Sequence, residues 1–325
     1  MKGVMKVVAI PVILALGAAG VGTYLAFRAD MRASRARLLA GSRVVSTACG
    51  PIEVAEVGDG LPVLMVHGTG GGFDQGLNLA RGLVGEGFRC IAVSRFGYLR
   101  TPLPQDASSA AQADALAAVL DTLETLRVAV LGVSAGAHPA AQLALRHPEK
   151  VEALALVVPA LYVPPEPGAP PATGPPAFIV DYVLRSDFLV WLMARLAPGV
   201  LLRAAGAPPS VQRDLSPQRR KELLDGFFPA SARHAGLTKD IRNAILGWPD
   251  LPIEQFRMPV LLVGAADDPY LSAPIVRYSA GRIPWARAVL LERGGHVLVG
   301  QERRIQQEVR TFLGAHVTNK EESGR

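Results

Sequence analysis

The chain has very few cysteines for its length. Only Cys49 and Cys90 occur among 325 residues, which is too few for a disulfide framework, and their spacing does not match that of metal-ligating pairs. Cys90 lies in the apolar stretch FRCIAV, where a thiol usually packs as a small buried hydrophobe. We therefore expect no metal site built on cysteine, and the cysteines do not indicate a compartment.

Acidic residues are scarce in one part of the chain, its first 43 residues. That segment has seven lysines and arginines and a single acid, Asp30, whereas the whole chain has 34 basic and 28 acidic side chains. The rest of the chain is therefore balanced, with 27 side chains of each sign. A body without excess positive charge lacks the electrostatic surface that attracts a phosphate backbone, so we expect no nucleic-acid partner.

The same segment has no charge between Val7 and Phe27, a run of 21 residues. As a helix this run would be about 31 Å long, close to the thickness of a bilayer's hydrocarbon core. We predict that residues 1–43 form a single-pass membrane anchor and a basic linker, and the arginines after the run favour a body on the cytoplasmic side. A cleaved signal peptide is the alternative, because two lysines precede the run and small residues occupy 17–22.

Beyond this segment the apolar runs are short and rich in Val, Leu and Ile, as in strands buried on both faces. The runs are PVLMVHG (62–68), FRCIAVS (88–94), RVAVLGV (127–133), VEALALVV (151–158), PVLLVGA (259–265) and ARAVLLE (286–292). Segments of helical character lie near 74–86, 107–125, 136–147, 272–282 and 298–316. The alternation predicts an α/β fold in which helices flank both faces of a mostly parallel sheet.

The alternation stops between residues 161 and 254. A proline-rich stretch at 164–176 suits neither a helix nor a strand. Segments of helical character follow at 178–196, 217–226 and 236–247. A helical insertion between two strands is typical of a lid over the edge of a sheet, whereas an unstructured linker is the alternative for 164–176. Asp240 and Arg242 in the last segment are interpreted either as a surface pair or as substrate contacts.

A serine between two glycines marks the point where one apolar run ends. Gly132, Ser134 and Gly136 form a Gly-x-Ser-x-Gly pattern between a strand-like and a helix-like segment, which is the context that a nucleophile elbow requires. The glycines are needed because so sharp a turn leaves no room for side chains. The N-terminus of the following helix also favours negative charge there. An ordinary strand-to-helix turn is the alternative.

With this motif the chain resembles the α/β-hydrolase superfamily over residues 44–316. HGTGGG at 67–72 is similar to the superfamily's oxyanion loop, GAADDPYLS at 264–272 to its acid turn, and GGH at 294–296 to its histidine turn. Serine, acid and histidine follow in the superfamily's chain order. The resemblance implies a mostly parallel eight-stranded sheet, and it divides the chain into a core at 44–160 and 255–317, a helical lid at 161–254 and a disordered tail at 318–325.

Histidine is the residue type suited to remove a proton from the serine near neutral pH. Of six histidines, only His296 follows a strand and a Gly-Gly turn, so we predict that it is the base. The acid that orients it is either Asp267 or Asp268. The spacing from Gly264 favours Asp267, whereas the DPYLS that follows resembles the superfamily's turn after its acid and favours Asp268, which we prefer.

Two backbone donors are needed to stabilise the oxyanion of an acyl-transfer intermediate. The resemblance places them on the N–H groups of Thr69 and Ala135, with Gly70 as the alternative to Thr69. The HGTGGG loop is not a phosphate loop, because the lysine of GxxxxGK[ST] is absent. We expect neither a metal nor a cofactor.

Two single residues reduce the number of reactions expected of this superfamily member. Dehalogenases and epoxide hydrolases of this superfamily use an aspartate where Ser134 stands, and Val297 replaces the tryptophan that usually follows the histidine in C–C bond hydrolases. We predict a serine hydrolase that cleaves a carboxylic ester or thioester of a hydrophobic small molecule through an acyl-enzyme. The alternatives are a non-catalytic, membrane-tethered ligand-binding protein on the same fold and a haloperoxidase-like or C–C hydrolase-like enzyme.

The expected substrate is hydrophobic because the predicted lid is strongly apolar. Eight apolar side chains of the predicted lid carry this expectation, and packing of the lid onto the core is the alternative interpretation of each. They are Phe178, Val183, Leu184, Phe188, Leu189, Trp191, Leu192 and Met193.

Overall fold

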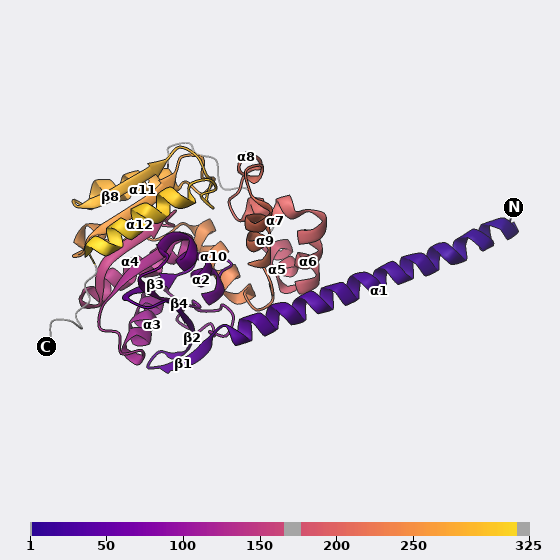
Figure 1. The fold of residues 1–325 in the computed structure, drawn as a ribbon, viewed down its shortest axis with the longest axis horizontal. Coiled ribbons are helices and arrows are strands. Elements are labelled where there is room, and N and C mark those ends of the chain that lie inside the picture. Colours follow the sequence, from indigo (N-terminus) through magenta and orange to yellow (C-terminus); the bar gives the residue numbers. More distant parts are fainter. Residues whose placement is uncertain (1, 166–176, 317–325) are drawn as a thin grey trace.

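The computed structural model describes residues 2–165 and 177–316, and its side chains from Leu14 onward except at 177, 178 and 180. The predicted tail at 318–325, most of the proline-rich stretch and the side chain of Phe178 lie outside this description. Eight strands of the described residues form one sheet (Figure 1). They are β1 (Arg43–Thr47), β2 (Gly50–Val57), β3 (Leu61–Val66), β4 (Phe88–Val93), β5 (Val128–Val133), β6 (Val151–Val157), β7 (Val260–Ala265) and β8 (Ala286–Leu291).

The sheet is mostly parallel, as predicted. Its strand order is β1-β2-β4-β3-β5-β6-β7-β8. Strand β2 is antiparallel to β1 and β4, and the remaining neighbours pair in parallel. The carboxyl ends of β3, β5, β7 and β8 therefore meet at one edge, which brings together loops far apart in the sequence.

Helices cover both faces of the sheet (Figure 1). Alternate residues of each strand point to opposite faces: in β5, Val130 packs with one group of helices, and Leu131 with the other. The first group is α3 (Ser109–Thr122), α4 (Ala137–Arg146) and α11 (Ser272–Arg282), and the second is α2 (Phe73–Leu79), η1 (Ala80–Val84) and α12 (Glu302–His316). Short helical turns η2 (Ser134–Gly136), η3 (Pro148–Lys150) and η4 (Ile253–Gln255) complete the core.

The hairpin of β1 and β2 has no counterpart among the predicted apolar runs. Polar residues interrupt both strands. Glu53 of β2 is an example, because it is buried although it is charged. Its carboxylate accepts hydrogen bonds from Ser42, Ser94 and Arg100. A buried polar group with partners in distant segments gives no apolar pattern for sequence reasoning to detect.

The insertion between β6 and β7 is helical, as expected for a lid. Its helices are α5 (Ala177–Arg185), α6 (Asp187–Leu196), α7 (Pro198–Ala204), α8 (Pro209–Gln212), α9 (Pro217–Asp225) and α10 (His234–Leu246). The single helix predicted over 178–196 is divided, because Ser186 caps α6 by accepting a hydrogen bond from the Leu189 N–H at 3.2 Å. Val190, Trp191, Leu201 and Phe228 of the lid form one apolar cluster with Met31, which precedes the sheet. Several of the predicted apolar lid residues therefore pack against one another.

Helix α1 (Lys2–Ala40) projects away from the body and meets it only near its C-terminal end (Figure 1). The predicted basic linker is therefore helical through Ala40, in keeping with its arginines, alanines and leucines, which favour helix. The Phe27 ring packs edge-on against the rings of Phe188 and Trp191 of α6, and the ring centroids of Phe27 and Phe188 are 5.2 Å apart. Arg35 makes an ion pair of 2.8 Å with Asp187.

The membrane-spanning helix predicted at Val7–Phe27 finds no support in the described residues. Among the helices of residues 2–165 and 177–316, none is both long enough and apolar enough to cross a membrane.

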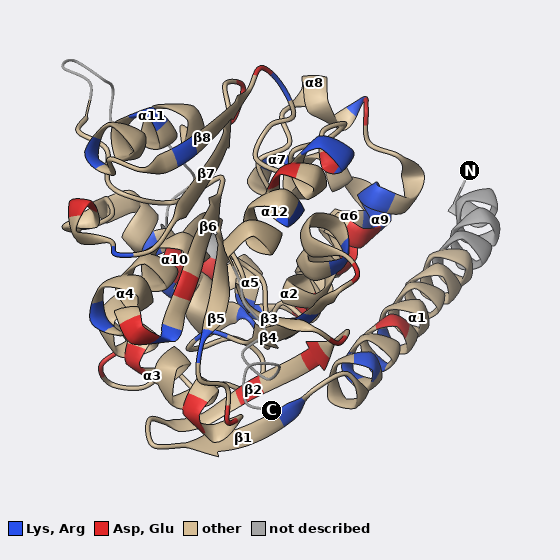
Figure 2. Ribbon diagram, turned by 60° about the vertical axis from the view of Figure 1, so that its left-hand side comes forward, with Lys and Arg blue, Asp and Glu red and all other residues tan. Residues whose placement is uncertain are grey.

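Charged residues of both signs are interspersed over the body (Figure 2). Many form ion pairs across neighbouring elements, such as Arg146 of α4 with Asp114 of α3 at 2.7 Å and Arg89 with Glu56 at 2.6 Å. These pairs lie at least partly in solvent, where each contributes little to stability.

Candidate active site

Ser134 occupies a sharp turn between β5 and α4. Its backbone has φ of +51°, a left-handed conformation that non-glycine residues rarely adopt. The flanking glycines are required by close approach: a Cβ on Gly136 would lie 2.2 Å from the Val66 carbonyl oxygen, and one on Gly132 would lie 2.8 Å from Ala140 Cβ. The strain and the close packing are those expected of a nucleophile elbow.

The His296 side chain lies against Ser134. Its Nε2 is 2.8 Å from Ser134 Oγ, and its Nδ1 is 2.8 Å from Asp268 Oδ2. Because the carboxylate only accepts, Nδ1 carries the proton, and Nε2 presents its lone pair to the serine hydroxyl. The structure thus brings together the serine, the histidine and one of the two candidate acids.

The two aspartates have different partners. Asp268 is only 5% exposed, and besides His296 it accepts a hydrogen bond of 2.8 Å from the Tyr270 N–H. Burial by itself would raise the pKa of Asp268, but the hydrogen bonds from His296, Ser272 and the Tyr270 backbone hold this pKa below its usual value. Asp267 instead accepts the N–H groups of Gly294 and Gly295 at 3.1 and 2.8 Å. Asp267 therefore holds the turn that presents His296, and Asp268 holds its ring.

The lid packs directly behind His296. The His296 N–H donates to the Gly206 carbonyl at 3.0 Å, and a Cβ on Gly206 would lie 2.2 Å from His296 Cβ. Tyr270 packs edge-on against the imidazole, with ring centroids 4.9 Å apart, and its hydroxyl donates to the Ala204 carbonyl at 2.9 Å. The loop between α7 and α8 is thus part of the support of the histidine, a contact that no sequence motif indicates.

The loop HGTGGG after β3 runs beside the serine. A Cβ on Gly68 would lie 3.0 Å from Ser134 Cβ. The Thr69 N–H has no hydrogen-bond partner among the described residues, and Ala135 is the second residue of the short helix η2, whose first N–H groups lack an intrahelical acceptor. The Gly70 N–H is already engaged, because it donates to the Tyr98 hydroxyl at 3.2 Å. Thr69 and Ala135 are therefore better placed than Gly70 to receive an oxyanion.

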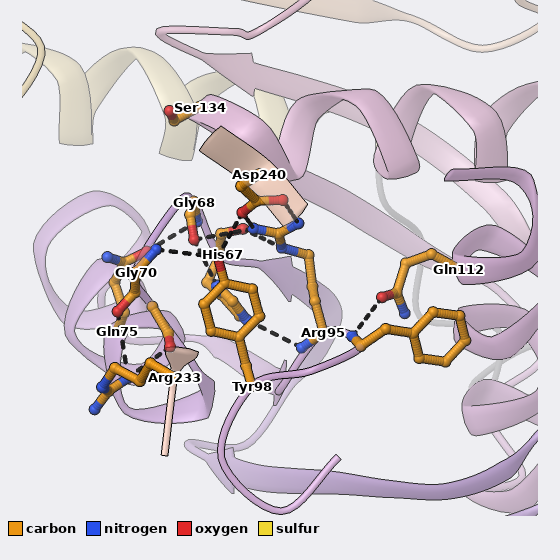
Figure 3. Close-up of polar contacts among 12 residues, drawn as sticks. His67, Gly68, Gly70, Gln75, Arg95, Tyr98, Gln112, Ser134, Arg233 and Asp240 are labelled. Carbon is orange, nitrogen blue, oxygen red and sulfur yellow. Dashed lines mark hydrogen bonds and ion pairs between the residues drawn. The ribbon is translucent and has the colours of Figure 1, made fainter. Parts of the chain in front are cut away.

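The interpretation of Asp240 as one of a surface pair is wrong. Asp240 is 1% exposed and forms a buried ion pair with Arg95, which is 3% exposed and follows β4. Arg95 in turn donates to the carbonyls of His67 and Gly68 in the oxyanion loop (Figure 3). No pattern in the sequence indicates this contact, because 145 positions separate the two partners.

A serine at the elbow, a histidine and a buried acid thus lie together at one edge of the sheet. A comparison of the chain with protein families agrees with this arrangement. A model of the alpha/beta hydrolase fold matches residues 62–302. The chain belongs to the alpha/beta hydrolase family. The resemblance drawn from the four motifs is thereby confirmed.

Among curated proteins, this hydrolase is similar to a pimeloyl-[acyl-carrier protein] methyl ester esterase of Neisseria meningitidis. The two are 29% identical over 215 residues, which cover 63% of this chain and 61% of the esterase. A 2-hydroxy-6-oxononadienedioate/2-hydroxy-6-oxononatrienedioate hydrolase of Paraburkholderia xenovorans is 36% identical over 100 residues, or 29% of this chain and 35% of that protein. The chain thus spans less than two thirds of the length of either relative.

Among solved structures, an alpha/beta hydrolase fold protein from Nakamurella multipartita superposes with a TM-score of 0.69. It is 28% identical and the match covers 85% of this chain and 99% of that one.

The other histidines of this hydrolase lie away from the serine hydroxyl. His67, the first residue of the oxyanion loop, is fully buried, and burial and the nearby Arg95 guanidinium hold its pKa well below the usual value. His138 on α4 is buried too, and burial lowers its pKa to about 4. Within the described ranges, no cluster of three or more His, Cys, Asp or Glu side chains could hold a metal ion.

Proposed function

We propose that this alpha/beta hydrolase cleaves a carboxylic ester or thioester of a hydrophobic small molecule through an acyl-enzyme on Ser134. The observation that supports this most strongly is the line of two 2.8 Å contacts from Asp268 through His296 to the Ser134 hydroxyl. A serine so placed can lose its proton to the imidazole as it attacks, and the buried carboxylate stabilises the imidazolium that forms.

The proposed reaction has two halves. Ser134 Oγ attacks the carbonyl carbon while its proton passes to His296 Nε2, and the oxyanion receives hydrogen bonds from the N–H groups of Thr69 and Ala135. Collapse of this intermediate breaks the bond to the alcohol or thiol, which takes the proton from His296. Water then gives a proton to His296 and attacks the acyl group, so that the acid is released and the Ser134 hydroxyl is restored.

An ester is favoured over other substrates by the relatives and by the site. The Neisseria protein is named as a methyl ester esterase, and its match to this chain covers 215 residues. A C–C hydrolase-like activity is the second candidate, because the Paraburkholderia hydrolase is more identical, at 36%. That match covers only 100 residues, however, and Val297 stands directly after the histidine.

The preference for an apolar substrate is tested with p-nitrophenyl acetate, butyrate, hexanoate and octanoate. We expect all four to be hydrolysed and kcat/KM to rise with acyl length. Burial of one methylene contributes about 0.8 kcal/mol, so the rise is up to about fourfold per methylene. The expected gain lies in acyl binding, and the dependence of the single-turnover rate of p-nitrophenyl release on enzyme concentration measures it separately from product release.

Three outcomes would contradict parts of this proposal. Hydrolysis of the acetate alone would contradict the apolar acyl group. No hydrolysis of any ester, together with turnover of 2-hydroxy-6-oxononadienedioate, would favour the second candidate. Inertness toward both substrate types in folded protein would favour the non-catalytic binding protein.

A further inference from the structure

The lid is joined to the underside of the oxyanion loop by a buried ion pair. Asp240 belongs to lid helix α10, and Arg95 belongs to the core. Asp240 Oδ1 accepts a hydrogen bond of 3.1 Å from Arg95 Nη1, and its Oδ2 accepts one from Arg95 Nη2. Burial of two charges is costly unless they are paired in good geometry. The lid carboxylate therefore fixes the position of the arginine.

Arg95 in turn fixes two successive carbonyl groups of the loop. Its Nε donates to the His67 carbonyl at 2.8 Å, and its Nη2 donates to the Gly68 carbonyl at 3.1 Å. A guanidinium is planar and presents its donors in a rigid fork, so its position determines the direction of both carbonyls. In Figure 3 the Gly68 carbonyl is directed at the Arg95 guanidinium, and Ser134 is drawn above that glycine.

The direction of the Gly68 carbonyl determines the direction of the Thr69 N–H. The peptide unit between these residues is planar and trans, so its C=O and N–H point in opposite directions. When Arg95 holds the carbonyl, it thereby holds the N–H that we assign to the oxyanion. His67, which donates from Nδ1 to the same carbonyl at 2.7 Å, adds a second restraint.

Tyr98 restrains the next peptide unit through the same carboxylate. Its hydroxyl donates to Asp240 Oδ2 at 2.6 Å and accepts from the Gly70 N–H at 3.2 Å. Because the hydroxyl has one proton, its bond to Asp240 leaves only lone pairs toward the loop. Asp240 therefore orients the tyrosine as an acceptor for Gly70, and so acts on the peptide units on both sides of Thr69.

We propose that Asp240 is a positioning residue for the oxyanion hole: through Arg95 and Tyr98, this lid carboxylate sets the orientation of the Thr69 N–H. The inference rests on the proposed function, since it assigns the Thr69 N–H a role in acyl transfer. It also means that α10 stays docked on the core during the reaction, while any opening of the lid for substrate occurs elsewhere in the insertion.

The test compares Asp240→Asn and Tyr98→Phe with wild type. Asp240→Asn keeps the shape of the side chain but removes its charge, and Tyr98→Phe removes one hydroxyl and is the milder change if the first variant folds poorly. Three measurements are made on each: kcat and KM with a p-nitrophenyl ester per titrated active site, the rate of Ser134 modification by a fluorophosphonate, and amide exchange of peptides covering residues 67–76.

Asp187→Asn is the matched control. Asp187 is also a buried lid carboxylate paired with an arginine, Arg35, and it additionally accepts hydrogen bonds from Ser231. Its partners lie outside the oxyanion loop. This variant therefore removes the charge of another lid carboxylate without acting on the Thr69 N–H.

We expect kcat to fall about 10- to 100-fold in both test variants, with KM within about threefold of wild type, because a misdirected donor weakens binding of the transition state but not of the ester. Fluorophosphonate modification slows by a similar factor, and exchange in 67–76 increases. Asp187→Asn stays within about threefold of wild type in all three measurements.

Wild-type kcat and fluorophosphonate rates in folded Tyr98→Phe and Asp240→Asn would overturn the inference, as would an equal loss in the control. The fluorophosphonate arm separates this inference from the proposed function. If the wild type reacts with the fluorophosphonate but hydrolyses no ester, the ester substrate is wrong and the relative rates of modification still decide on Asp240. If the wild type does not react at all, both are wrong.

Discussion

Ser134→Ala is expected to lower ester hydrolysis by about four to six orders of magnitude, to the level that the remaining site can support without a nucleophile. The reason is that the hydroxyl is the only group at the elbow able to form the acyl bond, and alanine offers no substitute. Initial rates with p-nitrophenyl butyrate, measured with protein from a preparation that excludes host esterases, check this result.

The fold of this variant should be unchanged. Alanine removes one oxygen from a residue whose backbone is already held by the close approach of Gly136 to the Val66 carbonyl. A thermal midpoint within a few degrees of wild type is the control that links the loss to chemistry. Equal hydrolysis by wild type and Ser134→Ala, once host enzymes are excluded, would rule out the acyl-enzyme.

Asp268→Asn is expected to lower kcat about 10³- to 10⁴-fold. Asp268 accepts from His296 through Oδ2 and from the Tyr270 N–H through the other oxygen. An asparagine has one carbonyl oxygen and one NH2 group, so it cannot accept both. If the NH2 group faces His296, Nδ1 must become the acceptor, and the proton moves to Nε2, where the lone pair for Ser134 is lost.

Asp267→Asn is the neighbouring control and should lose less than about tenfold in kcat. Its hydrogen bonds from Gly294 and Gly295 position the turn, and an asparagine oxygen can retain one of them. The lost bond is expected to appear as about 1 kcal/mol in the free energy of unfolding. The two variants are compared by kcat and by urea denaturation. A larger loss of kcat at Asp267 than at Asp268 would reverse the assignment of the acid.

Sequence reasoning anticipated the geometry of the site where a local pattern is required. The elbow needs small residues at fixed offsets from Ser134, and Gly132 and Gly136 therefore indicate it in the sequence. The histidine follows two glycines for a similar reason, since the turn that presents it bends sharply. The choice between Asp267 and Asp268 depended on the residues after them, and in the structure the following turn supplies the Tyr270 N–H that Asp268 accepts.

The contacts that sequence reasoning missed join segments far apart in the chain. Asp240 and Arg95 form one buried pair only because lid and core fold onto each other, and Gly206 meets His296 for the same reason. Asp240, Arg95 and Gly206 do not stand in a motif, so their partners cannot be inferred from composition or spacing.

The central claim is that Ser134 forms the acyl bond, and intact-protein mass spectrometry tests it most directly. After rapid acid quenching of a reaction with a p-nitrophenyl ester, we predict a mass increase of one acyl group less one hydrogen, located by peptide mapping to the segment containing Ser134, and its absence in Ser134→Ala. An acyl group found on another residue, or catalytic turnover by wild type without any acyl adduct under conditions that slow deacylation, would contradict the account.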